Sequence, residues 1–97
     1  MQASKKVEIV ISTLELEEVL SILNTLRVSG YTVIKNAWGK GDQGTYYNDL
    51  GQESGNSYIM TVCQDEQRVN YLIDELLPIL KRIGGVFLVT DSDWIHY

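Results

Sequence analysis

The chain is poor in the residues on which most metal centres and catalytic sites depend. Its 97 residues contain one histidine, His96, and one cysteine, Cys63. A single cysteine excludes an internal disulfide and a zinc cluster built on cysteines, and its apolar surroundings favour a buried structural thiol. No Ser-His-Asp arrangement, general acid–base pair or Walker A motif can be placed. We therefore expect a protein that is not an enzyme and has no metal site.

Basic residues are also scarce. Eight lysines and arginines face 13 aspartates and glutamates, so the net charge is −5. A nucleic-acid-binding surface needs clustered positive charge, and this balance argues against one. No apolar run approaches the ~20 residues of a membrane-spanning helix, and the N-terminal run is too short for a signal peptide. We expect a cytoplasmic protein with no nucleic-acid partner and no membrane insertion.

The apolar pattern predicts a single domain, 1–97, made of two strand–helix–strand halves. Strands are expected at 6–11, 31–38, 58–63 and 86–90. A capping-box pattern, Ser12 with Glu15, predicts the start of the first helix, and Gly30 its end. Asp65 is expected to cap a second helix that ends at Gly84 and Gly85, with either a kink or a shifted last turn at Pro78. Asp91 and Asp93 favour a turn before a short extended tail at 94–97.

This order predicts an α+β, ferredoxin-like split βαβ fold (βαββαβ). A four-stranded antiparallel sheet would carry both helices on one face. Val7, Ile9 and Ile11 would point to one side of the sheet and Val10 to the other. An apolar second face favours packing between subunits over a partly wet face. Trp38 and Trp94 are interpreted as packing residues near subunit boundaries, not as residues that stack on a ligand.

A polar, glycine-rich stretch at 39–57 separates the two halves. Loops this long in small domains are usually functional or disordered. Its adjacent tyrosines, Tyr46 and Tyr47, are either anchors for a partner or side chains that fold back on the protein. Carboxylates at Asp42, Asp49 and Glu53 do not match a calcium-binding loop and are expected to be solvated.

Three runs resemble the PII and PII-like signalling proteins of the nitrogen regulatory protein PII superfamily: SGYTVIKNAWGKG (29–41), YIMTVCQDEQRVNYLIDELLPIL (58–80) and GGVFLVTDSDWIHY (84–97). The resemblance covers nearly the whole chain. It implies a homotrimer with inward-facing sheets and clefts between subunits that bind adenine or cyclic nucleotides. It also implies that 39–57 is the T-loop, which docks on a membrane transporter or a metabolic enzyme.

The resemblance further implies a set of nucleotide-binding residues. Thr32 would lie near the adenine, the next glycines and lysine at the base of the T-loop, Gly84 and Gly85 in the B-loop, and His96 near a family arginine. The candidates are thus Thr32, Gly39, Lys40, Gly41, Gly84, Gly85 and His96. Glycine-rich turns can form anion-binding nests of backbone N–H groups.

The chain departs from the family pattern where cations are expected. Val86 replaces the B-loop lysine, and the sequence stops at Tyr97, before the second arginine. Because a triphosphate needs several cationic contacts, we expect ATP binding to be weakened or absent. Among the possible effectors AMP, ADP, cyclic AMP and ATP, a mono- or cyclic nucleotide fits better than ATP, and so does the absence of any ligand.

Partner docking is expected at Tyr46, Tyr47, Asp49 and Leu50 of the T-loop. Two alternatives remain open at this stage. One is a metal-binding trimer similar to the CutA family, which shares the fold. The other is a ligand-independent interaction module whose nucleotide site is vestigial.

Overall fold

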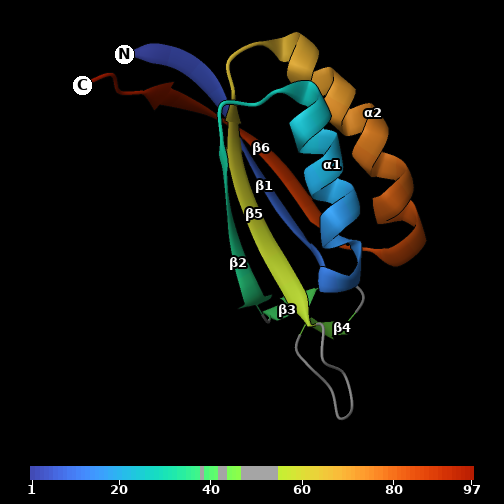
Figure 1. Cartoon of the computed structure of the whole chain (residues 1–97). Helices are drawn as coiled ribbons and strands as arrows, with labels where there is room; N and C mark the ends of the chain where they lie inside the picture. The colour runs from blue at the N-terminus through green and yellow to red at the C-terminus, as the bar shows by residue number, and fades with distance from the viewer. Residues whose placement is uncertain (38, 42–43, 47–54) are drawn as a thin grey trace.

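The computed structural model describes residues 1–37, 39–41, 44–46 and 55–97 (Figure 1). Its elements, in chain order, are β1 (Gln2–Ser12), the 3₁₀ helix η1 (Thr13–Glu15), α1 (Leu16–Leu26), β2 (Tyr31–Ala37), β3 (Gly39–Gly41), β4 (Gly44–Tyr46), β5 (Asn56–Cys63), α2 (Glu66–Ile83) and β6 (Val86–Trp94). None of the helices in this part of the chain is both long and apolar enough to cross a membrane.

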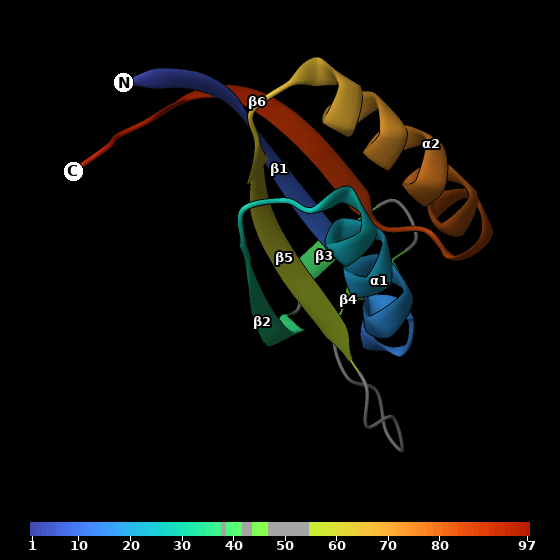
Figure 2. The same ribbon diagram turned by 45° about the horizontal axis from the view of Figure 1, so that its top comes forward.

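The main sheet is antiparallel, with strand order β2-β5-β1-β6. Both helices cover one of its faces (Figures 1 and 2). The β1-α1-β2-β5-α2-β6 order and the single helical layer confirm the predicted ferredoxin-like α+β fold.

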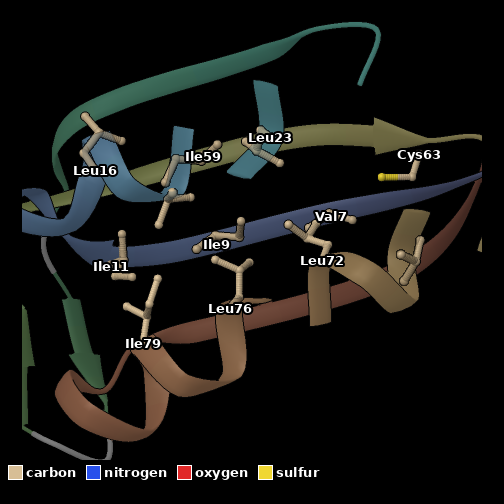
Figure 3. Packing of buried hydrophobic residues seen from close by; sticks show 12 residues of the cluster. Val7, Ile9, Ile11, Leu16, Leu23, Ile59, Cys63, Leu72, Leu76 and Ile79 are labelled. Atoms are coloured by element: carbon tan, nitrogen blue, oxygen red, sulfur yellow. The ribbon is translucent and has the colours of Figure 1, made fainter. Parts of the chain in front are cut away.

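The core lies between the sheet and the two helices (Figure 3). Val7, Ile9 and Ile11 alternate along β1 and are all buried, as their spacing predicts. They meet Leu23 of α1 and Leu76 of α2, which are fully buried. Each such side chain contributes about 1.5–3 kcal/mol when removed from water.

The first helix begins and ends differently from the prediction. The Ser12 hydroxyl accepts a hydrogen bond from the Leu14 N–H (3.3 Å), so it caps the 3₁₀ turn and not α1. Glu15 makes no side-chain cap bond; its carboxylate lies 3.6 Å from the Arg82 guanidinium of α2. The helix stops at Leu26 because Arg27 adopts a left-handed conformation (φ 57°). The prediction that Gly30 ends the helix is therefore wrong.

The second helix follows the prediction closely. The Asp65 carboxylate accepts the Arg68 N–H at 2.8 Å, and this bond is the main reason why the pKa of Asp65 lies below its usual value. The helix continues through Pro78 to Ile83. Gly84 ends it with φ 80°, a backbone angle that glycine adopts readily.

The predicted turn at Asp91 and Asp93 is wrong. Both residues lie within β6, where Asp91 pairs with Lys5 and Asp93 with Ala3 of β1. The β1–β5 ladder ends at Lys5, whereas the β1–β6 ladder continues to the pair Gln2–Trp94. The two chain ends thus form a ribbon that overhangs the sheet and runs toward the side of β2 (Figures 1 and 2).

The stretch 39–57 is not one continuous loop. Gly39–Gly41 pairs with Gly44–Tyr46 in a small antiparallel hairpin. At its other end β5 already starts at Asn56, and Ser57 is buried with its hydroxyl 2.7 Å from the Thr13 hydroxyl. The predicted docking residues Tyr47, Asp49 and Leu50 lie outside the described residues, as do Asp42, Glu53 and Trp38.

The sheet face turned away from the helices is mixed, and less apolar than predicted. Ile34 and Leu88 expose about half of their surface there (55% and 50%). In its centre the Tyr58 hydroxyl donates to the Glu8 carboxylate (3.0 Å), and the Lys6 ammonium lies 3.3 Å from the same oxygen. The bond from Tyr58 lowers the pKa of Glu8, while burial is the main cause of the raised pKa of Tyr58.

Candidate functional site

A pocket of about 290 Å³ lies where the overhanging ribbon meets the start of β2. Its lining residues come from three places: the turn before β2 with the first residues of that strand, the second half of β5, and the end of β6. They are Ser29, Gly30, Tyr31, Thr32, Met60, Thr61, Val62 and Trp94. The turn is held by the Thr61 hydroxyl, which donates to the Gly30 carbonyl at 2.6 Å.

The side chains that line this pocket are uncharged. No residue of its lining carries an ionisable acid or base that is charged at neutral pH. Hydroxyl groups, a thioether, aliphatic carbons and an indole are present instead. Such a surface can hold an aromatic or apolar group, but it offers no cation to a phosphate.

The sequence predicts different roles for two residues that line this pocket, Thr32 and Trp94. Thr32 is a predicted ligand residue, and its strand does place it in the lining. Trp94 is predicted to be a packing residue, although it lines the same pocket. The signal that could have found it is the run Val86–Trp94, which contains no glycine or proline and so can continue as one strand.

Gly84 and Gly85 lie at the opposite edge of the sheet, where α2 turns into β6. Gly85 has φ +132°, and a Cβ atom there would come within 2.6 Å of the Val10 carbonyl oxygen and 2.9 Å of a Leu80 methyl group. Close packing therefore explains this glycine without a ligand. The edge strands β2 and β6 are three strand spacings apart, so about 14 Å separates them across the sheet.

The backbone of Gly39–Gly41 forms β3, beyond the far end of β2 from Thr32. Thr32 and Ala37 are five residue steps apart along the strand, roughly 17 Å. Asn36, just before Ala37, has φ 63° and forms a bulge in the β2–β5 ladder. Bulges redirect a strand, and this one lies at the entry to the hairpin.

His96 follows β6 at the end that overhangs the sheet. Its Nε2 atom lies 3.2 Å from the Gln2 side-chain oxygen. The nine residues of β6 span about 26 Å, so His96 and Gly85 stand far apart. One chain therefore places the predicted residues in two groups, at opposite ends of the sheet: Thr32 and His96 at one, Gly39–Gly41 and Gly84–Gly85 at the other.

Other polar features of the described residues do not converge on a site. Beneath the ribbon, an open depression of about 510 Å³ contains the Lys5–Asp91 ion pair, whose hydrogen bond raises the pKa of Lys5. Cys63 is free and buried, and burial raises its pKa, which fits the predicted structural thiol. Within 1–37, 39–41, 44–46 and 55–97, no three His, Cys, Asp or Glu residues are grouped as metal ligands.

The fold and this arrangement agree with the comparisons with known proteins. The family model "Nitrogen regulatory protein P-II" matches residues 4–96. The chain therefore belongs to the P-II family of signalling proteins, which confirms the resemblance seen in the sequence.

Solved structures give the same answer. CPII, a nitrogen regulatory PII-like protein from Thiomonas intermedia K12 bound to ADP, AMP and bicarbonate, is 28% identical, with a TM-score of 0.83 over 93% of this chain and 86% of that chain. Its apo form is 26% identical, with a TM-score of 0.75 over 93% and 89%. GlnK of B. subtilis in complex with ATP, at 21% identity and a TM-score of 0.66 over 95% and 84%, shows the shared fold alone. No curated protein matches the chain.

Proposed function

We propose that this chain is a signal-transduction protein that senses an adenine nucleotide in clefts between subunits and regulates a transporter or a metabolic enzyme. The observation that carries the proposal is the separation of the predicted nucleotide-binding residues into two groups at opposite ends of one sheet. A site that uses both groups needs two copies of the chain. Its relative CPII, solved with ADP and AMP, supports an adenine nucleotide as the ligand.

A homotrimer supplies the second copy. The mixed face of the sheet, with Ile34 and Leu88 exposed around the Glu8–Tyr58 hydrogen bond, is the surface that would pack in it. The single domain spans 1–97 in this proposal. Assembly with other subunits also allows a chain of this length to bury more apolar surface.

The effector is a nucleotide of low charge. Lys40 is the one lysine among the proposed binding residues, and the net charge of the chain is −5. AMP, ADP or cyclic AMP should therefore bind better than ATP. Gly39, Lys40 and Gly41 would contact the phosphate, while Thr32 would lie at the base.

The T-loop, 39–57, would carry the signal. Ligand contacts at its base would bias the loop between conformations, and a protein partner would bind one of them. Tyr46, Tyr47, Asp49 and Leu50 are the proposed docking residues. The action would be cytoplasmic and would need no catalysis.

A thermal-shift panel with AMP, ADP, ATP, cyclic AMP, bicarbonate and divalent metals tests this function. A ligand that binds only the folded protein raises Tm by mass action. We expect AMP or ADP to raise Tm in the wild type and in a Lys35→Ala control, and much less in Lys40→Ala. A shift with metals alone would favour the CutA-like alternative, and no shift with any nucleotide would overturn the sensor.

A further inference from the structure

We propose that the indole of Trp94 stacks on the base of the bound nucleotide, in the pocket between the end of β6 and the start of β2. This inference rests on the proposed function, because it assumes that a nucleotide binds. It adds a residue that would make the protein prefer a nucleotide over a phosphorylated ligand that has no base.

The overhanging ribbon is what brings Trp94 to this pocket. In the sheet, β6 and β2 are the two edge strands and are separated by β1 and β5. Beyond Lys5 the ribbon leaves β5 and continues to its last pair, Gln2–Trp94. This ribbon runs toward the side of β2 (Figures 1 and 2). Trp94 therefore shares a pocket with Thr32 and Met60.

The lining of this pocket selects the base and not the phosphate. Because no lining residue is charged at neutral pH, a phosphate would lose its hydration without gaining a cation. The volume, about 290 Å³, lies just below the range of about 300–1,000 Å³ that is typical of small-molecule pockets. It suits one ring system better than a whole nucleotide, while the hydroxyl of Thr32 offers a hydrogen bond to the ring edge.

Trp94 also has surface left for a ligand. Its relative exposure is 37%, so part of the side chain is open to solvent in the chain by itself. Base–aromatic stacking contributes enough free energy to change affinity by about 5-fold to 150-fold when the aromatic ring is removed. The competing occupant of this pocket is a second copy of the chain, which would make Trp94 a packing residue.

The experiment uses the full-length protein with Trp38→Phe, so that Trp94 is the remaining tryptophan and reports by fluorescence. AMP is titrated, and ribose 5-phosphate serves as the probe without a base. We expect AMP to quench or shift the Trp94 emission, and ribose 5-phosphate to leave it unchanged.

Affinity for AMP is then compared between the wild type, Trp94→Leu and the aromatic control Trp94→Tyr, with circular dichroism and sedimentation to check fold and assembly. We expect Trp94→Leu to raise the Kd for AMP at least 5-fold and Trp94→Tyr to retain most affinity, with the Kd for ribose 5-phosphate equal in all three. An unchanged Kd and silent Trp94 emission, with AMP still bound, overturn the inference but not the proposed function. If Trp94→Leu changes the sedimentation but not the Kd for AMP, Trp94 is a packing residue and the inference is overturned. If the wild type binds no nucleotide at all, both the inference and the proposed function are overturned.

Discussion

Trp94 and Thr32 line the same pocket although their strands form opposite edges of the sheet. Their shared pocket depends on the length of the β1–β6 ladder, which continues three residues past the point where β5 ends. A shorter β6 that turned at Asp91 would leave the pocket without its indole. The ribbon thus places Trp94 in this pocket, in addition to pairing the two termini.

Replacing Gly85 by alanine should destabilise the protein by about 2–3 kcal/mol. The backbone at φ +132° disfavours a side chain, and the new Cβ atom would lie 2.6 Å from the Val10 carbonyl oxygen. Urea unfolding of Gly85→Ala and Gly30→Ala measures the effect. Gly30→Ala is the control, because a Cβ atom at that position would meet nothing within 4 Å, and it should change stability by less than about 0.5 kcal/mol. Equal losses in both variants would contradict the packing role.

The bulge at Asn36 should tolerate glycine but not a β-branched residue. Asn36 has φ 63°, a left-handed conformation that costs about 1–2 kcal/mol for most residues. We expect Asn36→Val to lose that much stability and to increase amide exchange at the β2–β5 pair Ala37–Asn56, whereas Asn36→Gly should behave like the wild type. Normal exchange in Asn36→Val would show that the bulge is not held by this residue.

The Asp65 cap of α2 should make the thermal stability of the protein depend on pH in the acidic range. The pKa of Asp65 is lowered in the folded protein, chiefly by the Arg68 N–H, from a starting value of 3.8. Its stabilising effect is therefore complete above that value and disappears as the pH falls through the lower folded pKa. We expect Asp65→Ala to melt earlier than the wild type at pH 7, with a gap that narrows below about pH 4. Asp65→Asn, which can still cap the helix, should lose less and show a flatter pH profile. A gap independent of pH would contradict this.

The mixed sheet face should control assembly. Leu88 is 50% exposed on that face, so a charge there would be buried between subunits of the proposed trimer. Sedimentation analysis should find Leu88→Glu dissociated into smaller species. Leu14→Glu, at a residue 79% exposed on η1, should keep the mass of the wild type. A wild type that sediments as a monomer would exclude the trimer.

Much of the fold could be predicted because local signals and burial agree. The alternation of Val7, Ile9 and Ile11 and the cap at Asp65 are local patterns, and the structure confirms both. The end of β6 could not be predicted in this way. Asp and Ser favour turns locally, but pairing with β1 satisfies the backbone of Asp91 and Asp93 and overrides that preference.

The candidate site was less predictable for the same reason. Thr32 can be found through its family motif, whereas the contribution of Trp94 depends on where a non-local ladder ends. Gly85 shows a second limit, since its distance to Val10 gives a packing reason for a glycine that the family motif assigns to a ligand. Sequence spacing reports neither relationship.

In the proposed function, this member of the P-II family binds an adenine nucleotide between its subunits. Equilibrium dialysis of the wild-type protein against ADP tests it most directly. We expect saturable binding that approaches one ADP per chain, and markedly weaker binding in Lys40→Ala. No saturable binding at millimolar ADP, by a protein shown to be folded and assembled, would contradict it.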